Sequence, residues 1–300
     1  MKPAAFEYVR PHSLGEALQA MARWGDECKP LAGGQSLVPL LNMRLAQPAV
    51  LIDLARVPEL QGIRAGGTEL VIGAMTRNVQ LEHDGRMPPL IAAALPQVGH
   101  FQIRNRGTIG GSLAHMDPAA EWPALALAFD ARLSLASARG RRTVPVGEFI
   151  RGPLMTALEP DELLVEVVLP VDVAVRGTTE ERVPPPPNPP SRGEWKGFGF
   201  AEVARRPGDF ALIGAACLQR APNRVAVAVF ATGTTPHRLP GLEGKLAAGL
   251  PDERELIEHA ASEIQVGGDI HASADYRRHV GARLVARVVR SAWGGAAASN

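Results

Sequence analysis

The chain has 300 residues, 46% of them hydrophobic, which is enough for two domains with sizeable cores. Its 32 Lys and Arg side chains nearly balance its 31 Asp and Glu side chains, so we expect no general attraction to nucleic acid or to an anionic membrane. No apolar run approaches the roughly 20 residues of a membrane helix, and the N-terminus lacks a hydrophobic signal core, so we expect a cytoplasmic protein without direct membrane insertion.

The cysteines and histidines show no metal-binding spacing. Cys28 and Cys217 are the only cysteines, too few for an iron–sulfur cluster, which normally takes about four thiolates. The eight histidines form no H-E-x-x-H or C-x-x-C grouping that would indicate zinc. We therefore predict no metal site on this chain and expect both thiols to be buried apolar side chains.

Residues 1–55 are expected to form a small α/β unit. A capping box at Ser13 and Glu16 begins a helix with one apolar face. The pattern then predicts a strand at 29–32, a helix at 36–45 and a buried strand at 50–53. The glycine turn within this unit thus follows the C-terminal end of a strand.

Residues 56–171 mix strands and helices without a strict βαβ rhythm, which favours an α+β fold. Thr76 is expected to cap one helix and Asp117 another, with Pro118 at the first position of the latter. The expected elements are hairpins at 63–72 and 131–146, helices at 76–82, 89–98 and 118–129, and a strand at 163–169.

Residues 172–194 interrupt this order with VPPPPNPP at 183–190. Proline lacks a backbone N–H, so we expect an exposed polyproline II insertion or linker, or alternatively a ligand for a proline-binding module. Residues 195–293 are expected to form a smaller α+β domain, and 294–300 a flexible tail. The elements expected in this domain are a three-stranded antiparallel sheet at 196–205, 212–220 and 224–230, followed by helices near 241–249, 252–266 and 273–293.

The last of these helices carries five arginines. They form either a solvated face of the helix or a docking surface for a partner subunit, and the sequence leaves both interpretations open. They are Arg277, Arg278, Arg283, Arg287 and Arg290.

Two glycine turns, AGGQS at 32–36 and TIGGS at 108–112, are the candidate binding elements. Glycine permits positive φ and close approach of a bulky ligand. A glycine turn running into a helix N-terminus offers unpaired backbone N–H groups that suit phosphate oxygens, so two such turns are expected to hold a diphosphate from both sides. Neither matches G-x-G-x-x-G, which disfavours a Rossmann site. Taken alone, a Gly-Gly pair is more often a plain turn than a binding element, by roughly five to one.

Three stretches extend these turns, and they occur in the order LAGGQSLVPLLNMRLAQPAVLIDLARV, HFQIRNRGTIGGSLAHMDPAAEWPALALAFDA and GDFALIGAAC. They closely resemble the FAD-binding medium subunit of the molybdenum hydroxylases, the group of carbon monoxide dehydrogenase and xanthine dehydrogenase flavoproteins. The resemblance runs from Phe6 to about Trp293, interrupted near 172–194. It implies a two-part FAD-binding domain of the p-cresol methylhydroxylase-like type at 1–171, with parts at about 1–55 and 56–171, followed by the smaller domain.

The resemblance also implies which residues contact FAD. Helix capping is an alternative role for Asp117 and Glu121, and core packing is one for Phe200. Arg104 and Arg106 either balance phosphate charge or anchor the loop. The segment at 149–154 and Gln35 depart from the family's pattern. The implied cofactor-binding residues are Ala32, Gly33, Gly34, Gln35, Ser36, Thr108, Ile109, Gly110, Gly111, Ser112, Asp117, Glu121, Leu164 and Phe200.

The function implied by the resemblance is electron transfer within a complex. A large subunit would carry the molybdenum cofactor, a small subunit the [2Fe-2S] clusters, and this chain the FAD that passes electrons to NAD, a quinone or O₂. A dimer of heterotrimers is implied, and no catalytic side chain is needed here. Two alternatives stay open: a free-standing FAD oxidoreductase of the same fold, and a flavin-free assembly subunit. The sequence does not identify the substrate.

Overall fold

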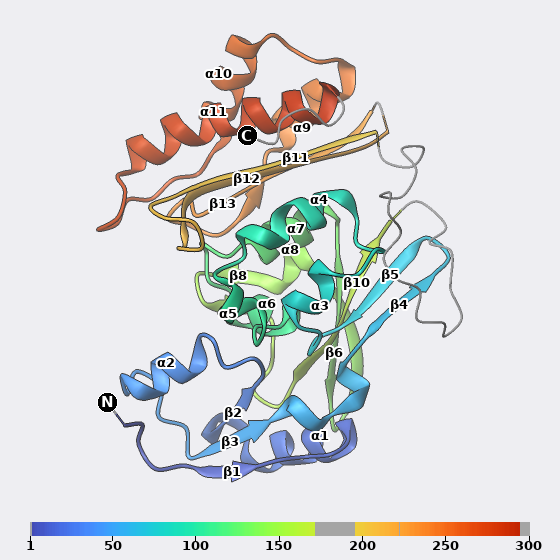
Figure 1. The fold of residues 1–300 in the computed structure, drawn as a ribbon, viewed down its shortest axis with the longest axis vertical. Coiled ribbons are helices and arrows are strands. Elements are labelled where there is room, and N and C mark those ends of the chain that lie inside the picture. Colours follow the sequence, from blue (N-terminus) through green and yellow to red (C-terminus); the bar gives the residue numbers. More distant parts are fainter. Residues whose placement is uncertain (1, 172–195, 222, 295–300) are drawn as a thin grey trace.

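The computed structural model describes residues 2–171, 196–221 and 223–294. The chain builds an elongated molecule in which the N-terminal unit, a central helix-covered sheet and the C-terminal sheet follow one another along the long axis (Figure 1). The predictions for the proline-rich insertion and for 295–300 fall outside the described residues.

The N-terminal unit is a three-stranded parallel sheet in the order β1-β3-β2. The Ser13 hydroxyl accepts from the Glu16 N–H at 3.2 Å, as the capping box predicts. The loop between β2 and α2 leaves the sheet at its C-terminal edge. The elements are β1 (Glu7–Val9), α1 (Leu14–Trp24), β2 (Cys28–Leu31), α2 (Leu37–Asn42) and β3 (Val50–Asp53).

The central part holds a five-stranded antiparallel sheet in the order β4-β5-β10-β6-β7, with helices against it. Both predicted hairpins are present. The elements are β4 (Ile63–Gly66), β5 (Glu69–Gly73), α3 (Asn78–Glu82), α4 (Pro89–Ala94), α5 (Phe101–Arg104), α6 (Ile109–His115), α7 (Glu121–Ala128), β6 (Arg132–Ser137), β7 (Gly140–Pro145), α8 (Val146–Phe149), β8 (Ile150–Gly152), β9 (Met155–Thr156) and β10 (Leu163–Pro170).

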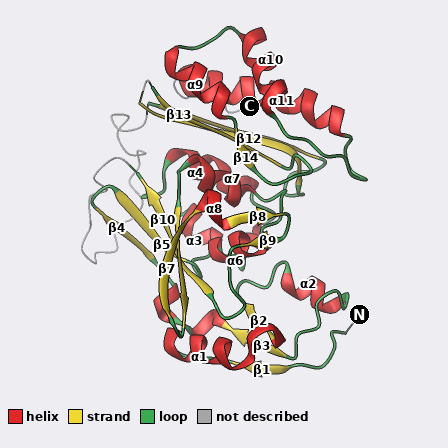
Figure 2. Cartoon of the chain, turned by 180° about the vertical axis from the view of Figure 1, so that it is seen from behind, coloured by secondary structure: helices red, strands yellow, loops and turns green. Residues whose placement is uncertain are grey.

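The C-terminal part is an antiparallel sheet in the order β11-β12-β13-β14, in which a two-residue edge strand joins the three long strands. Helices α9, α10 and α11 lie on its outer side and α4 and α7 on its inner side (Figures 1 and 2). The elements are β11 (Gly197–Ala204), β12 (Ala211–Ala221), β13 (Arg224–Phe230), β14 (His237–Arg238), α9 (Pro240–Ala248), α10 (Glu253–Glu263) and α11 (Ala274–Gly294).

The central helix α7 ties the parts together because every one of its residues is buried. A helix that is apolar on all sides needs partners on all sides, and α7 has the central helices below it and the C-terminal sheet above. One core cluster therefore runs from Trp122 through Phe129 to Phe230 of β13. The indole N–H of Trp122 donates to the side-chain amide oxygen of the buried Asn78 at 2.9 Å, which satisfies both groups.

Two predicted helix starts are wrong. The Thr76 hydroxyl bonds to the backbone of Gly62 instead of capping, and α3 begins two residues later. Asp117 accepts from the Ala119 N–H at 2.9 Å, which makes a local turn, so α7 begins only at Glu121. Each side chain bonds a backbone group other than those at the start of its helix.

The solvated-face interpretation fails for one arginine of α11. Arg277 is 3% exposed, whereas the other four are exposed. Its guanidinium donates to three backbone carbonyls and pairs with Asp269 at 2.7 Å. Arg277 is thus a structural anchor of the C-terminal part.

Among the described helices none is long and apolar enough to span a bilayer. The cytoplasmic location stays a prediction.

Candidate functional site

A cleft of about 840 Å³ lies where the loop after β2 faces the start of α6. Both glycine segments line it, together with the start of α7, the strand β10 and the turn between β11 and β12. The sequence-predicted residues on its wall are Ala32, Gly33, Gly34, Gln35, Ser36, Thr108, Gly110, Gly111, Ser112, Asp117, Glu121 and Leu164.

The first glycine segment supplies free donors. Among the described residues no acceptor faces the backbone N–H groups of the four residues 33–36, while Gly34 takes φ of +74°. The Gln35 amide donates to the Gly33 carbonyl at 3.1 Å and so steadies the loop from within. Successive unpaired N–H groups form an anion-binding concavity, which suits a diphosphate.

The second glycine segment is not the turn that the sequence predicted, because it forms the first turns of α6. Its N–H groups are already paired: Ile109 donates to Thr76, Gly110 to Ala74, and Gly111 to the Thr108 hydroxyl at 3.1 Å. The expectation of free donors on both sides is therefore wrong for this side. What remains available here are the hydroxyl protons of Thr108 and Ser112.

The glycines of the second segment serve close packing. A Cβ atom on Gly110 would collide with Ala74, and one on Gly111 would lie 2.8 Å from the Thr108 hydroxyl and 3.3 Å from Ala32. Side chains at these positions would push α6 away from its neighbours and narrow the cleft. The absence of side chains at Gly110 and Gly111 therefore keeps the cleft open on the side opposite the N–H donors of residues 33–36. Such a space fits an extended ligand with a diphosphate.

The acidic wall of the cleft is largely desolvated. Glu121 opens α7 and is only 6% exposed. Burial, and then the charge of Glu202 on β11, raise the pKa of Glu121 to about 8. Burial raises the pKa of Glu202 to about 7. Across the cleft, Leu164 on β10 is 6% exposed and presents an aliphatic surface.

Two predicted site residues lie off the cleft wall. Ile109 is fully buried in the central core. Phe200 stacks on Phe230, with ring centroids 5.9 Å apart and an interplanar angle of 20°, and packs on the same core. Its place supports core packing.

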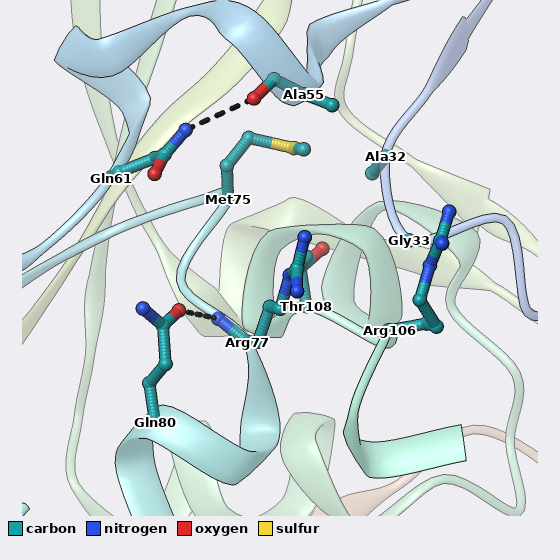
Figure 3. Close-up of a pocket in the computed structure, with 9 residues that line it drawn as sticks. All are labelled: Ala32, Gly33, Ala55, Gln61, Met75, Arg77, Gln80, Arg106 and Thr108. Carbon is teal, nitrogen blue, oxygen red and sulfur yellow. Dashed lines mark hydrogen bonds between the residues drawn. The ribbon is translucent and has the colours of Figure 1, made fainter. Parts of the chain in front are cut away.

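The two arginines near TIGGS have separate positions. Arg104 bonds Glu82 at 2.9 Å and two backbone carbonyls, so it anchors the loop. Arg106 instead borders a smaller pocket of about 110 Å³. Figure 3 shows this pocket, which is also lined by Gly33, Arg77, Gln80 and Thr108.

Sequence reasoning missed two groups on the cleft wall. Lys29 of β2 makes no ion pair among the described residues and is a free cation beside the loop donors. Its position four residues before Gly33 was the available signal. Asp209 and Phe210, in the turn between β11 and β12, also line the cleft, and Phe210 is 66% exposed. They lie within GDFALIGAAC, one of the stretches that carry the family resemblance, but no cofactor contact was predicted there.

Two family models match nearly the whole chain. Residues 4–172 match the FAD binding domain in molybdopterin dehydrogenase, and residues 198–292 match the CO dehydrogenase flavoprotein C-terminal domain. The two matches agree with the two-domain FAD-binding fold seen here.

Curated relatives are subunits of dehydrogenase complexes. The chain is 36% identical to subunit alpha of the 6-hydroxypseudooxynicotine dehydrogenase complex of Paenarthrobacter nicotinovorans, over 97% of this chain and 96% of that one. It is 35% identical to the carbon monoxide dehydrogenase medium chain of Hydrogenophaga pseudoflava, over 98% and 99%. A solved structure of the carbon monoxide dehydrogenase of Hydrogenophaga pseudoflava superposes with a TM-score of 0.85 at 34% identity, covering 98% of this chain and 99% of that one.

Proposed function

Because this chain belongs to the family of FAD-binding medium subunits of molybdenum hydroxylases, we propose that it receives electrons from a partner's [2Fe-2S] clusters and delivers them through FAD to an external acceptor. FAD can accept electrons singly and release them in pairs, which suits transfer to NAD, a quinone or O₂. The side chains of this protein then need only bind, orient and shield the cofactor.

The observation that carries the proposal is the cleft wall, where the N–H groups of residues 33–36 have no acceptor in the part of the chain that the structure describes, and where Thr108 and Ser112 add hydroxyls. The loop donors would hold the diphosphate, and the free ammonium of Lys29 would balance its charge. Glu121 and Asp117 would meet hydroxyl groups of the ribityl chain, and Leu164 would cover the ring system. Gly110 and Gly111 keep this space open.

The partners follow from what the relatives are called and from what this chain lacks. The relatives are named as subunits of larger complexes. No group of His, Cys, Asp and Glu in the described parts of the chain is arranged to hold a metal ion, and Cys28 and Cys217 are both buried and free. We propose a large molybdopterin-binding subunit and a small iron–sulfur subunit as partners, in a dimer of heterotrimers.

The first test is FAD binding by the full chain. We expect flavin absorbance that persists after excess FAD is removed, and that is lost when Gly110 and Gly111 are both changed to Val. Isolation of FAD-containing chain that turns over a substrate without partners would favour a free-standing oxidoreductase. A folded chain that takes up no FAD, alone or with its copurified partners, would favour a flavin-free assembly subunit.

The second test addresses electron transfer. The copurified complex is reduced with dithionite under argon, and its reoxidation by NAD, a quinone and O₂ is followed before and after removal of FAD. We expect one acceptor to lose its rapid reoxidation phase when FAD is absent and to regain it when FAD is restored. Reoxidation that is indifferent to FAD for every acceptor would contradict the proposal.

A further inference from the structure

Asn78, the first residue of α3, is a nearly buried amide on the wall of the cleft, with 3% of its surface exposed. Its backbone N–H donates to the Gly107 carbonyl at 2.9 Å, which ties the start of α3 to the segment before TIGGS. Its side-chain oxygen Oδ1 accepts from the indole N–H of Trp122 on α7, also at 2.9 Å. Two bonds to distant parts of the chain therefore hold this residue in place.

The bond to Trp122 determines how the amide of Asn78 is oriented. An indole nitrogen can only donate, so the atom that faces it must be the amide oxygen. The other orientation would set two donors against each other and leave the buried indole without a partner. The nitrogen Nδ2 and its two N–H groups consequently point away from Trp122.

The nitrogen lies where the two glycine segments of the cleft meet. A Cβ atom on Gly107 would be 3.2 Å from Nδ2 of Asn78 and 3.8 Å from Cγ of Gln35, and all three residues line the cleft. Because Gly107 has no side chain, nothing from that position covers the amide nitrogen. Nδ2 therefore stands beside the loop at 33–36, whose backbone N–H groups are also without acceptors in the described chain.

The two N–H groups on Nδ2 have no acceptor in the described parts of the chain. The nitrogen is not fully enclosed by protein, and the open space that Asn78 borders is the cleft. A nearly buried donor costs free energy unless a ligand or a water molecule accepts from it. Asn78 thus presents a fixed, unpaired donor to whatever occupies the cleft.

We propose that Asn78 is a further cofactor-binding residue, whose side-chain N–H groups donate to an oxygen of the diphosphate or the adjoining ribityl chain of FAD. This inference rests on the proposed binding of FAD in the cleft. The neighbouring loop at 33–36 suits the diphosphate, so oxygens of this part of the cofactor are the acceptors that would lie nearest to Nδ2. Because Trp122 already fixes the amide, the side chain loses little rotational freedom when it binds.

The first test separates the donor from the bond to Trp122, by fluorescence titration of the full chain with FAD. Trp122→Phe removes the indole N–H but leaves the amide, so the affinity should stay within about threefold of the wild type. Adding Asn78→Leu to this variant removes the donor as well, and we expect FAD to bind at least about tenfold more weakly, or about 1.4 kcal/mol. Replacing both partners of a buried hydrogen bond by apolar groups of similar shape is tolerated, so the double variant should fold.

The matched control is Asn105→Leu, the same change near TIGGS at a residue outside the set that lines the cleft, and it should bind FAD like the wild type. If Asn78 served only to hold Trp122, the Trp122→Phe chain would bind FAD equally well with and without Asn78→Leu. That result would overturn the inference while leaving the proposed function intact.

A second measurement observes the donor directly. The side-chain amide signals of Asn78 in nitrogen-15 NMR spectra of the full chain are assigned by their loss in Asn78→Leu. Their protons should exchange more slowly with water once FAD is bound, whereas the exchange of the Gln61 amide, which donates to the Ala55 carbonyl at 3.2 Å, should not change. Unchanged exchange at Asn78 in the FAD-bound chain would also overturn the inference. Absence of FAD binding by the wild type would overturn both this inference and the proposed function.

Discussion

The backbone carbonyl of Arg106 occupies the space into which a Cβ atom on Gly33 would project. Gly33 belongs to the loop after β2, and Arg106 lies two residues before the cap of α6. The two sides of the cleft therefore touch through their backbones, and the missing side chain at residue 33 sets how closely the N-terminal unit approaches the central part.

We predict that Gly33→Ala weakens FAD binding at least tenfold, because the two loops must separate to admit a methyl group. The same overpacking should lower the free energy of unfolding by about 1–3 kcal/mol. A fluorescence titration with FAD and a urea unfolding curve measure the two effects. Gly66→Ala is the control, since a Cβ there meets nothing within 4 Å. Wild-type affinity in a folded Gly33→Ala protein would refute the argument.

Thr108 has two roles that substitution can separate. Its hydroxyl accepts from the Gly111 N–H as the cap of α6, and its side chain faces the cleft. Thr108→Ala should cost about 1 kcal/mol of stability through the lost cap and should also weaken FAD binding. Thr108→Ser retains the hydroxyl and should preserve both. If Ser and Ala lower FAD affinity equally, the methyl group and not the hydroxyl is what the cofactor needs.

The sequence predicted the parts of the site whose hydrogen-bond partners are close by in the sequence, and it missed the parts whose partners are distant. AGGQS was placed correctly at the end of a strand because a turn is determined by its own few residues. TIGGS was placed at the cleft, but its N–H groups were taken as free. The acceptors of Ile109 and Gly110, at Thr76 and Ala74, lie 33 and 36 residues earlier, and no local pattern reveals them. The order of strands and helices was likewise predictable from periodicity, while the exact helix starts were not.

The buried residues of the C-terminal part show the same limit. Helical periodicity places Arg277 beside other arginines on the outside of α11, yet its acceptors at Leu212 and Gly267 come from a strand and a loop. Glu202 is one polar position within a strand, and no local pattern predicts the burial that raises its pKa to about 7.

Arg277 should be far more important for stability than its neighbours on α11. Arg277→Ala removes the buried guanidinium that donates to three backbone carbonyls and to one oxygen of Asp269, and we expect a loss of about 1–3 kcal/mol. Exposed Arg287 is the matched control, and Arg287→Ala should stay within about 0.5 kcal/mol of the wild type. Chemical unfolding followed by circular dichroism measures both. Equal effects of the two changes would show that the buried contacts do not determine stability.

Glu121 makes the chain less stable as pH rises. In the unfolded chain this carboxyl ionises near its usual value of 4.5, whereas burial in the folded chain holds its proton up to a pKa of about 8. Between these values the unfolded state binds fewer protons, so the free energy of unfolding falls with rising pH and levels off above about pH 8. Glu202, with a pKa raised to about 7, adds a loss of the same sign over a narrower range.

Glu121→Gln should therefore lose less stability than the wild type between pH 5 and pH 8, by on the order of 3 kcal/mol. Urea unfolding at a series of pH values measures this difference. His237, whose pKa is lowered by burial, acts with the opposite sign below its usual range, and comparing variant with wild type at each pH cancels it. Glu159→Gln should follow the wild-type curve. Parallel curves for Glu121→Gln and the wild type would mean that Glu121 is ionised in the folded chain and that its burial is relieved by solvent or by movement of α7.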